Sequence, residues 1–105
     1  MTLAALLEEL KEVDPKLYDD ISHLELIGWQ QPRNQAMDHL QGIIQRACER
    51  RGDWEVSVWW KDNKWVALIR LPGGYTDPHK VFAEESDSAA EALLAAYIAA
   101  VRASQ

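Results

Sequence analysis

Cysteine and histidine are the side chains of this sequence best suited to catalysis or metal binding, but neither occurs in a pattern that would do either. Cys48 is the only cysteine, and it falls on the apolar side of a helical repeat, which favours a buried structural thiol over a nucleophile. His23, His39 and His79 fall on separate predicted elements, without the spacing of a zinc motif. Because no nucleophile, base or ligand set converges, we expect no enzymatic activity, no metal and no cofactor.

Tryptophan is the residue type that points most clearly to binding. Four of the five tryptophans fall between residues 54 and 65, beside two lysines. Tryptophan is enriched at interface hot spots, so one near a hairpin tip could anchor a partner protein; packing in the core is the alternative. The candidate binding residues of this segment are Trp59, Lys61, Lys64 and Trp65.

Carboxylates form a second candidate binding surface. The net charge is −6, and residues 1–25 contribute seven acids and two bases, a net −5. Residues 26–80 carry six acids and eight bases (+2), and residues 81–105 carry four acids and one base (−3). Acids spaced along the first two predicted helices could bind a basic surface, with a solvated helix face as the alternative. These acids are Glu8, Glu9, Glu12, Asp19 and Asp20.

The same charge argues against nucleic acid as the partner. Binding to a phosphate backbone needs concentrated cations, and the arginines at 46, 50 and 51 are explained equally well as cations at a helix end. The helix–β–β–β–helix order expected for residues 33–103 resembles double-stranded RNA-binding domains. Those domains require a basic start to their last helix, where this sequence has the acidic residues 84–88.

Hydrophobic spacing predicts three helices in the first half of the chain. Leucines at i, i+3, i+4 and i+7 predict a helix over residues 3–12, capped by Thr2. Asp14, followed by proline, starts a second helix that Gly28 ends. A third helix is predicted over residues 33–51, where arginines and a glycine mark its end.

The period then changes from helix to strand. Alternation over residues 54–60 and 65–71 predicts a β-hairpin, and Asp62-Asn63 suits a two-residue turn. A third strand is expected over residues 80–84, and a capping box at Ser88 starts a closing helix with seven alanines among residues 89–100. The pairs expected in the hairpin are Trp60 with Trp65, Val58 with Ala67, Val56 with Ile69, and Glu55 with Arg70.

These elements predict one α+β domain over residues 1–105, with residues 1–28 as an N-terminal helical layer. One face of the hairpin would leave Trp59, Val66 and Leu68 in water unless residues 3–24 cover it. We therefore expect a three-layer α/β/α sandwich around a small antiparallel sheet of about three strands, in the order α-α-α-β-β-β-α.

Composition favours a cytoplasmic protein. No run of about 18 apolar residues could cross a bilayer, so we expect no membrane association. The N-terminus has glutamates directly after its leucines and no basic segment before them, unlike a signal peptide. A single cysteine fits a reducing compartment.

Three segments resemble the small phage-encoded proteins of the phage ABA sandwich domain family. They are Ile27-Gly28-Trp29, the tryptophan-bearing hairpin of residues 54–71, and the acidic, then alanine-rich residues 83–96. The resemblance spans residues 17–103 and implies a phage protein with no catalytic residue. Residues 86–93 also resemble the strand-to-helix step of HicB-like antitoxins, whose partner is a small toxin.

The sequence thus favours a non-enzymatic accessory protein of a phage or other mobile element, located in the host cytoplasm if phage-encoded. It would act by binding another protein, for instance by inhibiting a host defence component. The alternative is an antitoxin-like or nucleic-acid-associated regulator that uses the basic middle segment. A homo-oligomer is left open.

Overall fold

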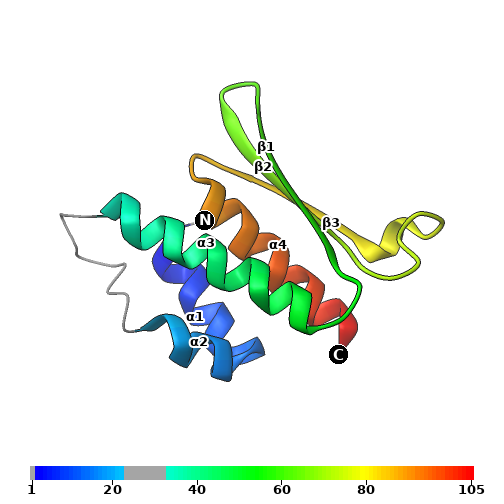
Figure 1. The fold of residues 1–105 in the computed structure, drawn as a ribbon, viewed down its shortest axis with the longest axis horizontal. Helices are drawn as coiled ribbons and strands as arrows, with labels where there is room; N and C mark the ends of the chain where they lie inside the picture. The colour runs from blue at the N-terminus through cyan, green and yellow to red at the C-terminus, as the bar shows by residue number, and fades with distance from the viewer. Residues whose placement is uncertain (1, 23–32) are drawn as a thin grey trace.

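The computed structural model describes residues 2–22 and 33–105, and within these ranges it has four α-helices and three strands in the expected order. The α+β class and the α-α-α-β-β-β-α order are confirmed (Figure 1). The segment Ile27-Gly28-Trp29 and the predicted helix end at Gly28 lie outside the described residues. The elements are α1 (Leu3–Val13), α2 (Pro15–Ser22), α3 (Arg33–Arg50), β1 (Glu55–Lys61), β2 (Lys64–Arg70), the short 3-10 helix η1 (Pro78–Lys80), β3 (Val81–Ser86) and α4 (Ala89–Ser104).

Side-chain caps begin three of these helices at the residues that the sequence indicated. Thr2 accepts a hydrogen bond from the Ala5 N–H at 3.2 Å, which caps α1. Asp14 Oδ1 accepts from the Leu17 N–H at 3.2 Å, and Ser88 Oγ accepts from the Glu91 N–H at 3.4 Å. Each cap satisfies a backbone donor that the first helical turn would otherwise leave unpaired.

The hairpin has the predicted register. Asp62 and Asn63 both have positive φ, 53° and 64°, as a two-residue hairpin turn requires. Trp60 lies opposite Trp65, and Glu55 lies opposite Arg70. The third strand begins one residue later and ends two residues later than expected. Residues 78–80 form η1, which the Asp77 side chain caps, and pairing with β2 then continues to Ser86.

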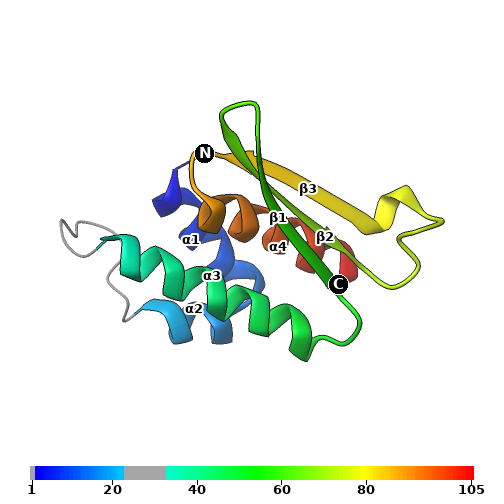
Figure 2. The same cartoon turned by 45° about the horizontal axis from the view of Figure 1, so that its top comes forward.

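All four described helices lie on one side of the sheet (Figures 1 and 2). Helix α4 is central, since it contacts β2, β3, α3 and α1. The covered face, called the inner face below, carries Val56, Val58, Ala67, Ile69 and Phe82, all of which belong to the main hydrophobic core or pack against it.

The N-terminal helices do not take the expected place over the other face of the sheet. Leu6, Leu10 and Leu17 are buried in the same cluster as the residues of α4, whereas Val66 is buried outside that cluster. Helix α1 packs on α4 and α2 instead. The physical reason is that α4 has apolar residues around most of its circumference, so it offers one side to the sheet and another to α1. Its buried residues are Ala90, Ala92, Leu93, Leu94, Ala96, Tyr97, Ile98, Ala100 and Val101.

Arg51 joins three parts of the fold just after α3. Its Nε donates to Tyr97 Oη at 3.0 Å and its Nη2 donates to Asp14 Oδ2 at 3.2 Å, while Tyr97 Oη donates to the same carboxylate oxygen at 2.6 Å. The guanidinium also lies over the rings of Trp54 and Tyr97, at 5.3 and 5.5 Å from their centroids. This arginine therefore acts inside the fold, connecting the α1–α2 junction to α4 and to the start of β1.

Candidate functional site

The face of the sheet turned away from the helices is called the outer face here. Its residues follow from the register: Glu55, Ser57, Trp59, Val66, Leu68, Arg70, Val81, Ala83 and Glu85. Trp59 is 38% exposed, whereas Val66, which lies between Trp59 and Glu85 on the neighbouring strands, keeps only 8% exposure. The apolar middle of the outer face is thus covered in part by its own side chains, and Trp59 is the large apolar group it presents to solvent.

A loop closes one end of the outer face. Tyr75 Oη donates to Glu55 Oε2 at 2.6 Å, Arg70 Nη1 donates to the same oxygen at 3.1 Å, and the guanidinium lies 4.3 Å from the centre of the tyrosine ring. The hydrogen bond from Tyr75, with a further contribution from Arg70, holds the pKa of Glu55 below its usual value. Gly74 permits this approach, because a Cβ there would meet Arg70 Cγ and lie 3.0 Å from the Leu71 carbonyl oxygen. The apolar strip of the outer face, formed by Trp59, Val66 and Leu68, therefore ends at a polar cluster that these contacts hold in place.

The hairpin tip forms the other end. Lys61 and Lys64 are exposed there and lie opposite each other. Trp65 is half-buried on the inner face, and its ring meets that of Trp60 edge to face at 5.5 Å. Trp60 is 55% exposed, so among the four tryptophans that the structure describes, Trp59 and Trp60 are the most open to solvent. Sequence reasoning missed Trp60 because alternation places it on the core side, although the part of the strand next to a turn can extend past the helices.

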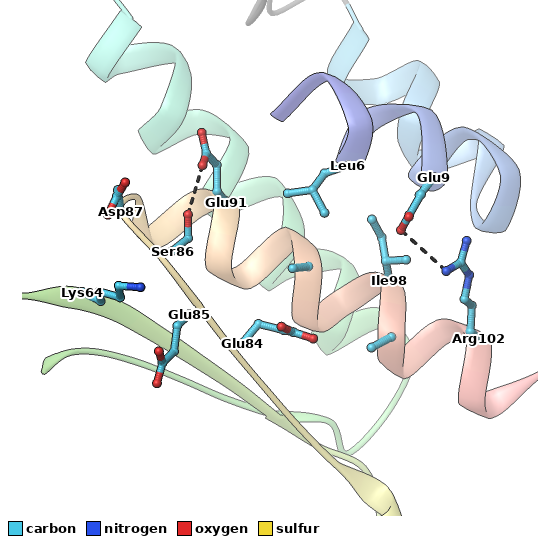
Figure 3. Close-up of a pocket in the computed structure, with 12 residues that line it drawn as sticks. Leu6, Glu9, Lys64, Glu84, Glu85, Ser86, Asp87, Glu91, Ile98 and Arg102 are labelled. Atoms are coloured by element: carbon cyan, nitrogen blue, oxygen red, sulfur yellow. Dashed lines mark hydrogen bonds and ion pairs between the residues drawn. The ribbon is translucent and has the colours of Figure 1, made fainter. Parts of the chain in front are cut away.

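An acidic groove of about 510 Å³ lies where α1, α4 and the end of β3 meet (Figure 3). Leu6, Ala95, Ile98 and Ala99 contribute apolar surface to it. Its charged and polar lining residues are Glu9, Lys64, Glu84, Glu85, Ser86, Asp87, Glu91 and Arg102. Arg102 pairs with Glu9 at 3.6 Å, and Ser86 Oγ donates to Glu91 Oε2 at 3.0 Å (Figure 3). Five carboxylates and two cations leave the groove with a net charge of −3.

The predicted carboxylates are distributed over two surfaces. Glu8, Glu12, Asp19 and Asp20 are exposed on α1 and α2, and Glu9 lines the acidic groove together with Lys64. The structure therefore brings two residues from separate candidate sets into one place. The acids at 84, 85 and 87 were missed as site residues. The available signal was their run just before the last helix, which was interpreted as an argument against RNA binding and as part of the family resemblance, not as a binding surface.

In the described part of the chain, the cysteine and the histidines are not arranged as an activated nucleophile and its base would be. Cys48 is fully buried, and burial is the main cause that raises the pKa of its thiol to about 12, so the thiolate is scarce at neutral pH. His39 and His79 are exposed. Over residues 2–22 and 33–105, no three residues among His, Cys, Asp and Glu are grouped as a metal site would need. None of the helices in these ranges is long and apolar enough to span a bilayer.

No family model matches the sequence, and no curated protein and no solved structure is significantly similar to it. The resemblances to phage ABA sandwich proteins and to HicB-like antitoxins therefore stay predictions. Function has to be inferred from the surfaces that the fold presents.

Proposed function

We propose that this chain is a non-enzymatic accessory protein of a phage or other mobile element, which acts in the cytoplasm by binding another protein. A host defence component is the kind of partner we put forward. The proposal rests on one observation above all, which is the outer face: an antiparallel sheet face that no described helix covers and that presents Trp59 at 38% exposure.

The make-up of the outer face suits a protein partner. Interface hot spots are enriched in tryptophan surrounded by groups that exclude water, and Trp59 lies beside Val66 with Leu68 on the same strand. The polar cluster of Glu55, Arg70 and Tyr75 lies at one end of this strip, as a polar rim would. Isolated exposed apolar side chains are common on any protein, but here the exposed Trp59 lies beside further apolar side chains, Val66 and Leu68, on one uncovered sheet face.

Nucleic acid is a less suitable partner for the same surface. Arg51 is engaged with Asp14 and Tyr97, and Arg70 is engaged with Glu55, so two cations of the basic middle segment are already used within the fold. Of the remaining cations at the hairpin tip, Lys61 and Lys64, the second lines the acidic groove and so lies close to the acidic end of β3. Phosphate binding would require a concentration of free cations that these contacts reduce.

The test is capture of a partner from a lysate of the host, followed by affinity measurements with the purified partner. Trp59→Ala and Leu68→Ser should each weaken 1:1 binding by about tenfold or more, as expected for hot-spot residues. Trp60→Ala is the matched control, because Trp60 is the neighbouring and more exposed tryptophan on the opposite face of β1. It should leave the affinity within about twofold.

Two results would contradict the proposal. One is a partner whose affinity is unchanged by both outer-face variants. The other is a gel shift of duplex or single-stranded nucleic acid at moderate salt that Trp59→Ala does not affect and that charge reversal at Lys61 removes. The second result would favour the regulator that the basic middle segment suggested.

A further inference from the structure

Strand β3 is an edge of the sheet, since β2 lies between it and β1. The Leu71 N–H donates to the Lys80 carbonyl at 2.9 Å, and the antiparallel register then pairs Phe82, Glu84 and Ser86 with β2 by backbone hydrogen bonds. The N–H and C=O groups of Ala83 and Glu85 consequently point to the free edge. No described strand pairs with them, and both residues are exposed.

The layer of helices is wider than the sheet on this side. Helix α1 lies against α4 and has no substantial contact with any strand, so the surface between α1 and β3 is where the acidic groove opens. Strands in a sheet lie about 4.8 Å apart and helices about 10 Å apart, so three strands do not cover three adjacent helices. A fourth strand beside β3 would lie over the junction of α1 and α4 and close the groove (Figure 3).

Charge selects the occupant of that position. Side chains of an added strand alternate between the outer face and the groove, and those directed to the groove would meet Glu84, Asp87 and Glu91 over an apolar base. A lysine or arginine side chain suits both the apolar base and the carboxylates of the groove, because its aliphatic stem packs on apolar surface and its charged end reaches the carboxylates. A second copy of this chain fits poorly, since pairing β3 with β3 brings Glu84 and Glu85 of both copies together.

We infer that β3 binds an extended basic segment of a partner protein by strand addition, with alternate lysine or arginine side chains in the acidic groove. Such binding takes its affinity from main-chain hydrogen bonds and its specificity from the pockets beside the strand. The inference is independent of the proposed role of the outer face, because it uses the other face and the edge of the sheet.

The test uses the full chain and a short acetylated, amidated peptide in which lysine and valine alternate. We expect saturable binding that weakens with salt, together with slower hydrogen exchange of the Ala83 and Glu85 amides. Glu84→Lys should weaken binding by about tenfold or more. Glu12→Lys is the matched control, because it changes the net charge equally at an exposed α1 residue outside the groove, and it should change the dissociation constant by less than about threefold.

A second comparison separates strand addition from charge attraction alone. The same peptide with N-methyl groups on the residues that face β3 keeps its charge but cannot pair, so it should bind at least about tenfold more weakly. Equal binding of the methylated peptide, equal effects of the two charge reversals, or no binding of the parent peptide would each overturn the inference. The Trp59→Ala variant should bind the peptide normally, so this result and the partner test fail or succeed separately.

Discussion

At the scale of single residues, the structure depends most on the polar contact set around Asp14. Its carboxylate caps α2, accepts from Tyr97 and pairs with Arg51, while its side chain is only 15% exposed. Burial raises the pKa of Asp14, but the hydrogen bonds from Tyr97, from the Leu17 N–H and from Arg51 outweigh burial and leave the pKa below the usual carboxyl value. Asp14 is thus a structural residue, although acids of its segment were considered for binding.

We predict that Asp14→Asn lowers the free energy of unfolding at pH 7 by about 1–3 kcal/mol, because Arg51 and Tyr97 lose a charged acceptor. A carboxyl whose pKa is lower in the folded state stabilises the protein above its unfolded pKa of about 3.9, and this contribution is lost as the pH falls through the folded value. Urea denaturation should therefore show a smaller difference in the free energy of unfolding between the wild type and Asp14→Asn at about pH 3 than at pH 7.

Asp20→Asn serves as the control for that measurement, since Asp20 is an exposed carboxylate on α2, the helix that Asp14 caps. Its effect should stay within about 0.5 kcal/mol at both pH values. If Asp14→Asn is as stable as the wild type at pH 7, the contacts of the Asp14 carboxylate make no net contribution to the free energy of unfolding, which would contradict the prediction.

At the scale of elements, the hairpin could be predicted in detail because its signals are local. Alternation identifies the strands, and Asp62-Asn63 restricts the turn to two residues, which determines every pair from Lys61 with Lys64 to Glu55 with Arg70. The limits of β3 could not be predicted as well. The start of β3 depends on η1, whose cap at Asp77 can be recognised in the local sequence. The end of β3 depends on its pairing with β2, which no local sequence pattern indicates.

We predict that the turn tolerates only residues suited to positive φ. Asn63→Val should destabilise the protein by about 1–2 kcal/mol, because a β-branched side chain is strained at a φ of 64°. Asn63→Gly should stay within about 0.5 kcal/mol of the wild type. Melting temperatures of the variants check this prediction. Ser57→Val is the control, because it adds a valine at an exposed strand position. Equal stability of Asn63→Val and Asn63→Gly would contradict the prediction.

At the scale of the whole molecule, the number and order of the elements could be predicted, but not which side of the sheet the N-terminal helices occupy. The apolar residues Trp59, Val66 and Leu68 on one face of the hairpin suggested that helices cover this face. The alanines of α4 concealed a second apolar side of that helix, which receives Leu6 and Leu10. The same limit applies to the candidate site. Trp59 could be identified by its type and position, but the acidic groove exists only because α1, α4 and β3 meet.

Two truncations, one of a leucine and one of a tryptophan, test on which side of the sheet the N-terminal helices lie. Leu10→Ala should cost about 2–5 kcal/mol, because Leu10 is fully buried between the N-terminal helices and α4. Trp59→Ala should cost less, about 1–2 kcal/mol, because Trp59 lies on the uncovered outer face and keeps 38% exposure. Both values come from urea denaturation. A loss at Trp59 as large as that at Leu10 would mean that another part of the chain covers the outer face.

The central place of α4 also constrains how the protein is made. During synthesis the N-terminus leaves the ribosome first, so α1, α2, α3 and the whole sheet emerge before residues 89–104 do. Until then the inner face of the sheet and the apolar side of α1 lack the helix that both pack against, and they share little surface with each other. A nascent chain that ends before Ala89 should therefore remain protease-sensitive and attractive to chaperones, and folding should begin only when the last helix has left the exit tunnel.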